Sequence, residues 1–126
     1  MMDKLDEIFM MQAMFDEEVL QKRGLTGISR EEWIQKETLA MMDELSELIN
    51  EVNYKWWKNP KPIDEEAVKG ELVDILHFFT SMCLKMGMDG EELHRRYLEK
   101  NKENFDRQHG LSKKPGYALS EMPTEK

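Results

Sequence analysis

The chain has 126 residues, of which 40 % are hydrophobic and 35 % charged, and its formal net charge is −8 at pH 7. This length suits one domain with one core, and no apolar run approaches the roughly 20 residues of a membrane span. An acidic chain repels a polyanionic backbone, which argues against binding to a nucleic acid polymer. The N-terminus has acids where a secretory signal would have a basic and then an apolar region. We therefore expect a cytoplasmic protein.

Signals at the ends of each segment predict helices in the first half of the chain. The first helix is expected over about residues 3–23, because Gly24 favours the left-handed conformation of a helix terminus. The second is expected to begin at Ser29, where Glu32 completes a capping box, and to reach about residue 53.

Two prolines interrupt the pattern within residues 55–62, and two more helices are expected over about 64–87 and 89–110. No stretch alternates apolar and polar residues for long enough to indicate a strand. The sequence thus predicts an all-α, four-helix bundle-like domain over residues 1–110 and an irregular C-terminal tail over 111–126.

Two helices carry acid pairs with the same spacing, Glu44 and Glu47 on one, Glu71 and Asp74 on the other. With Glu44 at zero on a helical wheel, the apolar residues of its helix fall between about 40° and 140°, and Glu47 lies at about 300°. With Glu71 at zero, the apolar residues of the third helix occupy nearly the same arc, and Asp74 again lies at about 300°. If the apolar stripes pack together, the four carboxylates converge at one edge of the core.

Four anions gathered at one edge repel each other unless cations compensate them. Oxygen ligands at this charge density suit Mg²⁺ or Mn²⁺, which bridge phosphate oxygens and activate water. The alternative is that the acids form a solvated face or ordinary salt bridges, as a single E-x-x-E pair usually does. Glu37 and Glu51 share the shoulder of Glu44, and for both we expect surface solvation.

Charge is divided unevenly along the chain. Residues 1–93 carry a net charge of −11, whereas residues 94–114 carry +4. An acidic centre beside a basic flank suits a small phosphate ligand that is bound through a metal ion.

The acid pairs lie in longer motifs. The pattern E-x-x-E followed after 23 residues by E-x-x-D resembles the signature of the all-α NTP pyrophosphatases, which include MazG-like enzymes, dCTP pyrophosphatases and dimeric dUTPases. The segments 42–49, 55–58 (Lys-Trp-Trp-Lys) and 71–78 resemble the dimeric dUTPase pattern, and residues 97–110 resemble that family's phosphate-binding segment. Gln12 resembles the glutamine of its first motif, so the resemblance spans about residues 5–110.

This resemblance implies a homodimeric dUTP diphosphatase that converts dUTP and water to dUMP and pyrophosphate. It implies that Glu44, Glu47, Glu71 and Asp74 hold Mg²⁺, with Mn²⁺ as a substitute. Either Glu44 or Glu47 would also be the general base for the attacking water. Lys58, Lys100 and Arg107 would hold phosphate oxygens, and Asn104 would assist at the nucleotide. Larger family members insert extra helices before the last motif as a substrate cap, which this chain lacks, so we expect its basic tail to close over the substrate.

Aromatic residues near the acids suggest further contacts. Trp57 could stack on a base or sugar, and Trp56 is expected to pack against the bundle, although these roles could be exchanged. Phe78 either forms a wall of the pocket or packs in the core. His77, one turn beyond Asp74, is expected to pack or to support a ligand rather than bind metal directly. Cys83 is expected to be a buried, inert thiol.

Other functions remain open. The family often has asparagine where this chain has Asp16, so a dCTP-type or broader MazG-like NTP pyrophosphatase is the nearest alternative. Glu91-x-x-His94 matches one element of a ferritin-like di-iron bundle, with Asp74-x-x-His77 as the second candidate. The third alternative is a helical interaction module without enzymatic activity.

Overall fold

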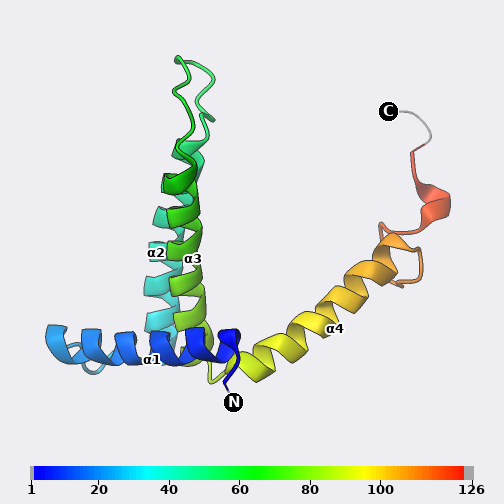
Figure 1. Ribbon diagram of the computed structural model, residues 1–126. Helices are drawn as coiled ribbons and strands as arrows, with labels where there is room; N and C mark the ends of the chain where they lie inside the picture. The colour runs from blue at the N-terminus through cyan, green and yellow to red at the C-terminus, as the bar shows by residue number, and fades with distance from the viewer. Residues whose placement is uncertain (1, 124–126) are drawn as a thin grey trace. The chain divides into compact units, whose positions relative to one another are not determined.

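A computed structural model describes residues 2–123 of the chain. It contains the helices α1 (Lys4–Arg23), α2 (Arg30–Glu51), α3 (Glu65–Lys85) and α4 (Gly90–Gln108), followed by a 3₁₀ turn at Leu119–Glu121 (Figure 1). No strand occurs within residues 2–123, so the all-α prediction is confirmed. The last three residues of the predicted tail, 124–126, lie outside the described residues.

Short polar side chains begin the helices as the sequence indicates. The side chain of Ser29 accepts a hydrogen bond from the backbone N–H of Glu32 at 3.1 Å, and Asp64 caps α3 in the same way. These contacts satisfy backbone donors that have no partner inside the helix. Gly24 ends α1 in the left-handed region at φ 62°, which a residue with a side chain adopts only at a cost.

The second helix ends at Glu51, two residues earlier than expected. Asn53 adopts a φ of 56°, in the left-handed region that asparagine tolerates. Its side chain donates to the carbonyl oxygen of Lys61 at 2.8 Å and accepts from the Lys61 N–H at 3.0 Å. These two hydrogen bonds close the loop that connects α2 to α3.

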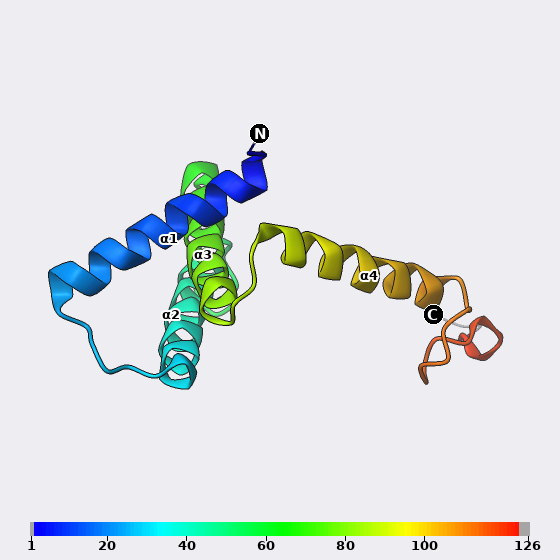
Figure 2. The ribbon, with the colours of Figure 1, turned by 90° about the horizontal axis from the view of Figure 1, so that it is seen from below.

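The contacts divide the chain into two units, one ending at Asp89 and one beginning at Gly90. In the first unit α2 and α3 lie side by side and antiparallel, and α1 packs across α3 (Figures 1 and 2). The acid-bearing helices of the sequence analysis are therefore direct neighbours. The predicted functional boundary at residue 110 is not tested by this division and stays a prediction.

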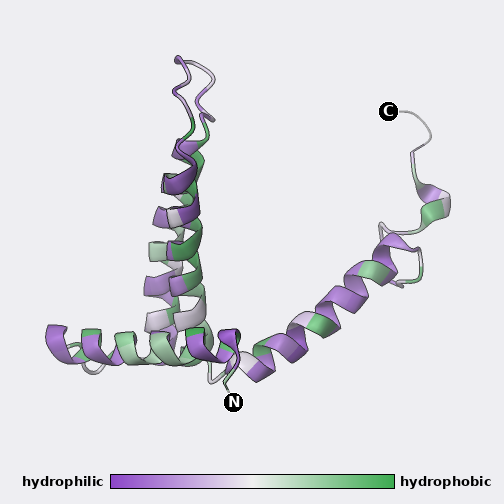
Figure 3. Ribbon diagram, viewed as in Figure 1, coloured by the Kyte–Doolittle hydropathy of each residue, from purple (hydrophilic) through white to green (hydrophobic). Residues whose placement is uncertain are grey.

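The first unit buries few apolar side chains. Among the described hydrophobic residues only Phe9 and Cys83 are fully buried, and burial raises the pKa of the Cys83 thiol, as expected for an inert cysteine. Hydrophobic residues run along both α2 and α3 (Figure 3), yet Leu72 is 53 % exposed and Leu45 and Phe79 are also exposed. The periodicity identified the apolar face correctly, but the unit alone does not cover it.

The second unit contains α4 and the chain that follows it. The Ser112 hydroxyl donates to Glu103 Oε1 at 2.7 Å, and the Arg107 guanidinium lies 5.4 Å from the centre of the Tyr117 ring. Gly110 has a φ of 72°, and the Leu119 side chain lies 3.0 Å from the position that a Cβ would occupy there. The described part of the tail therefore folds back on the end of α4, with one 3₁₀ turn in otherwise irregular backbone.

No helix in residues 2–123 is both long enough and apolar enough to cross a membrane.

Candidate active site

The packing of α2 against α3 brings three of the four predicted metal ligands together. One carboxylate oxygen each from Glu44, Glu47 and Glu71 lies within 4.8 Å of the other two. Glu44 and Glu71 are half-buried, and the Oε2 atom of each is buried without receiving a hydrogen bond from an N–H or alcohol group of the described residues. Buried carboxylate oxygens without a donor are costly, and a hard divalent cation is the partner that such a donor set fits.

The acids of this cluster change one another's pKa values. The pKa of Glu71 is raised to about 7, first by a hydrogen bond that its protonated form shares with Glu44, then by burial and by the charge of Glu47. The pKa of Glu44 is also raised. Its hydrogen bond with Glu71 lowers that pKa, but burial and the negative charges of Glu47 and Asp74 outweigh the effect. The site therefore holds more negative charge than its own groups compensate.

Asp74 is exposed and lies one turn beyond Glu71 on α3, at the border of the cluster. Its charge acts on Glu44, and both residues line the same cavity. It is not one of the three residues whose oxygens lie within 4.8 Å of one another. Its predicted role as a fourth ligand stays a prediction.

A cavity of about 670 Å³ extends from Glu44 and Asp74 between the three helices of the first unit. Gln12, Phe78 and Trp33 are among its lining residues. Ligand pockets commonly have volumes of roughly 300–1,000 Å³, so this cavity has room for a nucleoside. The predicted pocket residues Gln12 and Phe78 thus lie in the wall of a cavity that reaches the acids.

One part of this wall is a hydrogen-bonded chain from α1 to α3. Gln12 is buried, and its Nε2 atom donates to Asp16 Oδ1 at 2.9 Å. Its Oε1 atom lies 2.7 Å from Nδ1 of His77. His77 thus contacts a cavity residue, and its expected role, which is to pack or to support a ligand rather than bind metal directly, stays a prediction.

A second group of polar residues lies deeper and joins all three helices. Ser81 is 1 % exposed, and its hydroxyl lies 2.7 Å from Asp16 Oδ2 and 2.6 Å from Glu37 Oε1. Lys85 Nζ donates to Ser81 Oγ at 2.9 Å and to Glu37 Oε1 at 3.1 Å, and it lies 4.5 Å from the centre of the Trp33 ring. We call Asp16, Glu37, Ser81 and Lys85 the buried polar cluster.

The expectation that Glu37 is solvated is wrong, because this side chain is 8 % exposed and belongs to the buried polar cluster. The only sequence signal was its position seven residues before Glu44, on the same face of α2. Its cationic partner Lys85 lies 48 positions away, and no local pattern connects the two. The role of Ser81 was missed for the same reason.

The loop between α2 and α3 carries the other predicted contacts of the first unit. Lys58 lines a second, smaller cavity of about 260 Å³ together with Lys55 and Lys61. Trp57 is 59 % exposed, and Trp56 is 85 % exposed and touches Trp57 edge-to-face at 4.7 Å between ring centres. The expectation that Trp56 packs against the bundle is wrong. The loop contains two prolines and is closed by the Asn53–Lys61 hydrogen bonds, and it extends beyond the ends of the helices.

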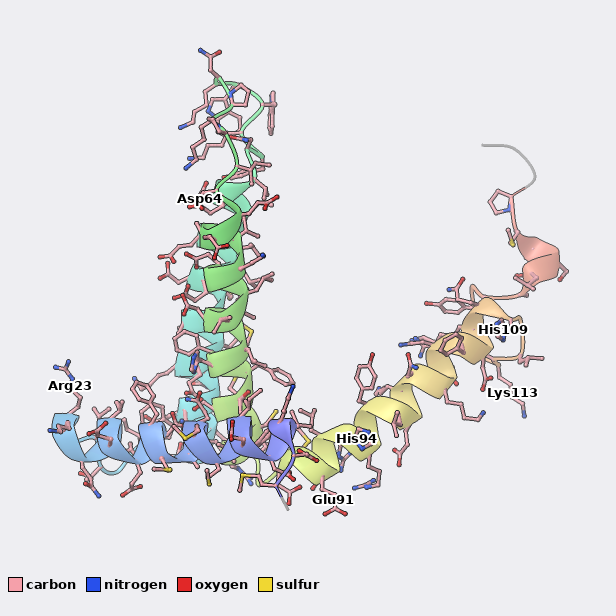
Figure 4. All side chains as sticks on the ribbon, in the orientation of Figure 1. Arg23, Asp64, Glu91, His94, His109 and Lys113 are labelled. Atoms are coloured by element: carbon pink, nitrogen blue, oxygen red, sulfur yellow. The ribbon has the colours of Figure 1, made fainter. Side chains whose placement is uncertain are left out.

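The remaining predicted contacts, Lys100, Asn104 and Arg107, all lie on α4 in the second unit. Arg107 Nε donates to Glu103 at 3.1 Å. Glu91 and His94, the residues of the di-iron alternative, are exposed on the first turns of the same helix (Figure 4). Whether α4 reaches the acids stays a prediction.

Comparisons with known proteins give a family and several relatives. A family model described as dUTPase matches residues 4–89. The dCTP pyrophosphatase of Enterobacteria phage T4 is 36 % identical over 87 residues, which cover 58 % of this chain and 51 % of that protein. The dCTP pyrophosphatase of Enterobacteria phage LZ5 is 36 % identical over 85 residues, 68 % of this chain and 48 % of that protein. The chain spans about half the length of these two curated relatives.

A DNA replication protein of phage T4 is 33 % identical over 81 residues, 53 % of this chain and 21 % of that protein. No solved structure matches the chain.

Proposed function

The chain belongs to the dUTPase family, and from that premise we propose that it is a Mg²⁺-dependent nucleoside triphosphate pyrophosphatase. It would hydrolyse a pyrimidine deoxynucleoside triphosphate between the α- and β-phosphates, releasing a monophosphate and pyrophosphate. One observation carries the proposal: three carboxylates from two facing helices meet at the border of a cavity of nucleoside size, and two of them, Glu44 and Glu71, have a buried oxygen without a donor among the described residues.

Glu44, Glu47, Glu71 and Asp74 would hold the divalent cation. A hard cation at this position supplies charge for the phosphate oxygens and makes the attacking water more acidic. Mg²⁺ is favoured because all the donors are oxygens, and Mn²⁺ accepts the same ligands. Of the two glutamates on α2, either accepts the proton of the attacking water as general base.

The leaving pyrophosphate gains negative charge as the bond breaks, and fixed cations at that position lower the barrier. Lys58 is one such cation on the loop of the first unit, where Lys55 and Lys61 line the same cavity. Lys100 and Arg107 on α4 would bind phosphate oxygens, Asn104 would contact the nucleotide, and the tail would close over it. Trp57 has an exposed ring available for stacking on the base or sugar.

Two substrates are candidates. The family resemblance favours dUTP, giving dUMP. The two phage relatives named dCTP pyrophosphatases, together with an aspartate at position 16, favour dCTP. A panel of dUTP, dCTP, dTTP and UTP separates them, and also distinguishes either from a broader MazG-like enzyme.

We also propose a homodimer. The exposed apolar residues of α2 and α3, among them Leu45, Leu72 and Phe79, form a surface that a second copy would bury. One chain has a mass of 15.0 kDa, and sedimentation analysis is expected to give a species of about twice that mass.

The decisive experiment measures pyrophosphate release from each nucleotide with and without Mg²⁺. Release is expected only with Mg²⁺, and it is expected to stop when Glu44→Gln removes one carboxylate charge. If no nucleotide yields pyrophosphate and Mg²⁺ leaves the melting temperature unchanged, the chain is a helical interaction module and the proposal is wrong.

A further inference from the structure

The hydrogen-bonding direction of the cavity wall follows from its chemistry. A carboxylate without a proton only accepts hydrogen bonds, so the Gln12 atom that lies 2.9 Å from Asp16 Oδ1 is the amide nitrogen. The amide oxygen then faces Nδ1 of His77 at 2.7 Å. An amide oxygen also only accepts, so Nδ1 of His77 donates the proton of this hydrogen bond.

Glu37 adds another acceptor to the lining of the same cavity. Its Oε1 atom receives hydrogen bonds from Ser81 and Lys85 at 2.6 and 3.1 Å. Its Oε2 atom is buried and receives none from the described residues. An oxygen that gives up water without gaining a donor is costly, and a ligand that brings a donor removes that cost.

The wall also has more negative than positive charge. Its lining includes the carboxylates of Asp16, Glu37, Glu44 and Asp74 but the ammonium groups of only Lys36 and Lys85. Lys85 Nζ lies 3.9 Å from Asp16 Oδ2 and 3.1 Å from Glu37 Oε1. Lys85 already donates to Ser81 and Glu37 and lies against the Trp33 ring. The wall therefore has unused hydrogen-bond acceptors that a ligand could engage.

We propose that Asp16 and Glu37 act as specificity-determining residues that select a base with an exocyclic amino group, cytosine, over uracil. The inference rests on the proposed nucleotide-binding function of the cavity. The N4 amino group of cytosine carries two hydrogens, and carboxylates are its natural acceptors. Uracil has the O4 oxygen at the same position, which would place an acceptor against the acceptors of the wall and leave both unpaired.

The test measures binding rather than turnover. The full chain is titrated by calorimetry, in the presence of Mg²⁺, with the non-hydrolysable α,β-imido analogues of dCTP and dUTP. One correctly paired donor changes discrimination by roughly tenfold or more, so the dCTP analogue is expected to bind at least about tenfold more tightly. Glu37→Gln and Asp16→Asn each place an amide N–H₂ in the wall, where it can donate to O4 of uracil. Each is expected to shift the ratio of affinities toward dUTP by about tenfold.

Glu18→Gln, the same substitution at an exposed residue of α1, is the matched control and is expected to leave the ratio unchanged. Thermal melts establish that the variants fold, and the wild-type ratio tests the inference even if one variant does not. Equal or tighter binding of the dUTP analogue by the wild type overturns the inference, as does failure to bind either analogue. An unchanged ratio in the folded variants also overturns it.

The pyrophosphate assay separates this inference from the proposed activity. If the chain prefers the dCTP analogue but releases no pyrophosphate from either nucleotide, base selection stands and the hydrolytic function falls. If pyrophosphate is released equally from dCTP and dUTP, in step with equal binding, hydrolysis stands and base selection falls.

Discussion

Removing one buried hydroxyl tests whether the buried polar cluster holds the helices of the first unit together. Ser81 lies on α3, and its Oγ atom is within hydrogen-bonding distance of Asp16 on α1, Glu37 on α2 and Lys85 one turn away. Ser81→Ala deletes these contacts without adding bulk. We expect a large loss of stability, because two carboxylates then remain beside a single ammonium group.

The expected size follows from the number of hydrogen bonds that the hydroxyl makes. It has one proton to donate and accepts one hydrogen bond from Lys85, so about two bonds to charged groups are lost. Hydrogen bonds to charged groups contribute roughly 1.5–3 kcal/mol each, and the higher helix propensity of alanine returns about 0.5 kcal/mol. The free energy of unfolding is therefore expected to fall by about 3 kcal/mol. At roughly 4 °C per kcal/mol for a domain of this size, the melting temperature falls by about 12 °C.

Urea denaturation followed by circular dichroism measures this difference directly, at one fixed protein concentration because the chain is expected to dimerise. Ser46→Ala, at an exposed position of α2, is the matched control and should change stability by no more than about 0.5 kcal/mol. A Ser81→Ala variant as stable as this control would mean that the cluster does not hold the helices, and the reasoning would be refuted.

Three further predictions concern the acid cluster. Glu44→Gln, Glu47→Gln and Asp74→Asn are each expected to abolish pyrophosphate release while the circular dichroism spectrum stays unchanged, and near-full activity in two of them would show that the ligands are misassigned. Mg²⁺ at about 100 times its dissociation constant is expected to stabilise the protein by about 2.7 kcal/mol, and a scan of melting temperature against Mg²⁺ should show this in the wild type but much less in Glu71→Gln. The pKa of Glu71 is raised from 4.5 to about 7, so between these values the folded metal-free protein holds a proton that the unfolded chain releases. Its contribution to the free energy of unfolding is full below pH 4.5 and is lost as the pH rises through about 7. Urea titrations at several pH values should find this pH dependence in the wild type and not in Glu71→Gln.

The ends of the helices were predictable because they depend on contacts between residues that are close together in the sequence. Ser29 and Asp64 bond the third residue of the helices that they begin, and Gly24 ends α1, so each boundary is decided by residues close together in the chain. The end of α2 was placed too late, because the Asn53 side chain bonds Lys61 across the loop. That contact spans eight positions, and no helix-ending rule contains it.

The acid cluster was predictable because it depends on helical periodicity alone. Two pairs at the same angle from two apolar stripes meet once the stripes pack, and Glu44, Glu47 and Glu71 do meet. Burial was harder to predict. A periodic pattern identifies which face is apolar but not how much of it another element covers, and Leu72 stays half exposed for this reason.

The buried polar cluster and the acid cluster are related by a spacing that neither helix reveals alone. On α2, Glu37 precedes Glu44 by seven residues, and on the antiparallel α3, Asp74 precedes Ser81 by seven. Seven residues of helix advance about 10 Å along the axis, and both pairs lie on the lining of one cavity. The acceptor-rich wall at Glu37 and Ser81 thus lies about two helical turns from the carboxylates of Glu44 and Asp74. This separation is comparable with the length of a nucleoside. A base held at Glu37 would direct its phosphates toward Glu44, so the same two helices would fix both which base is accepted and which bond meets the acids.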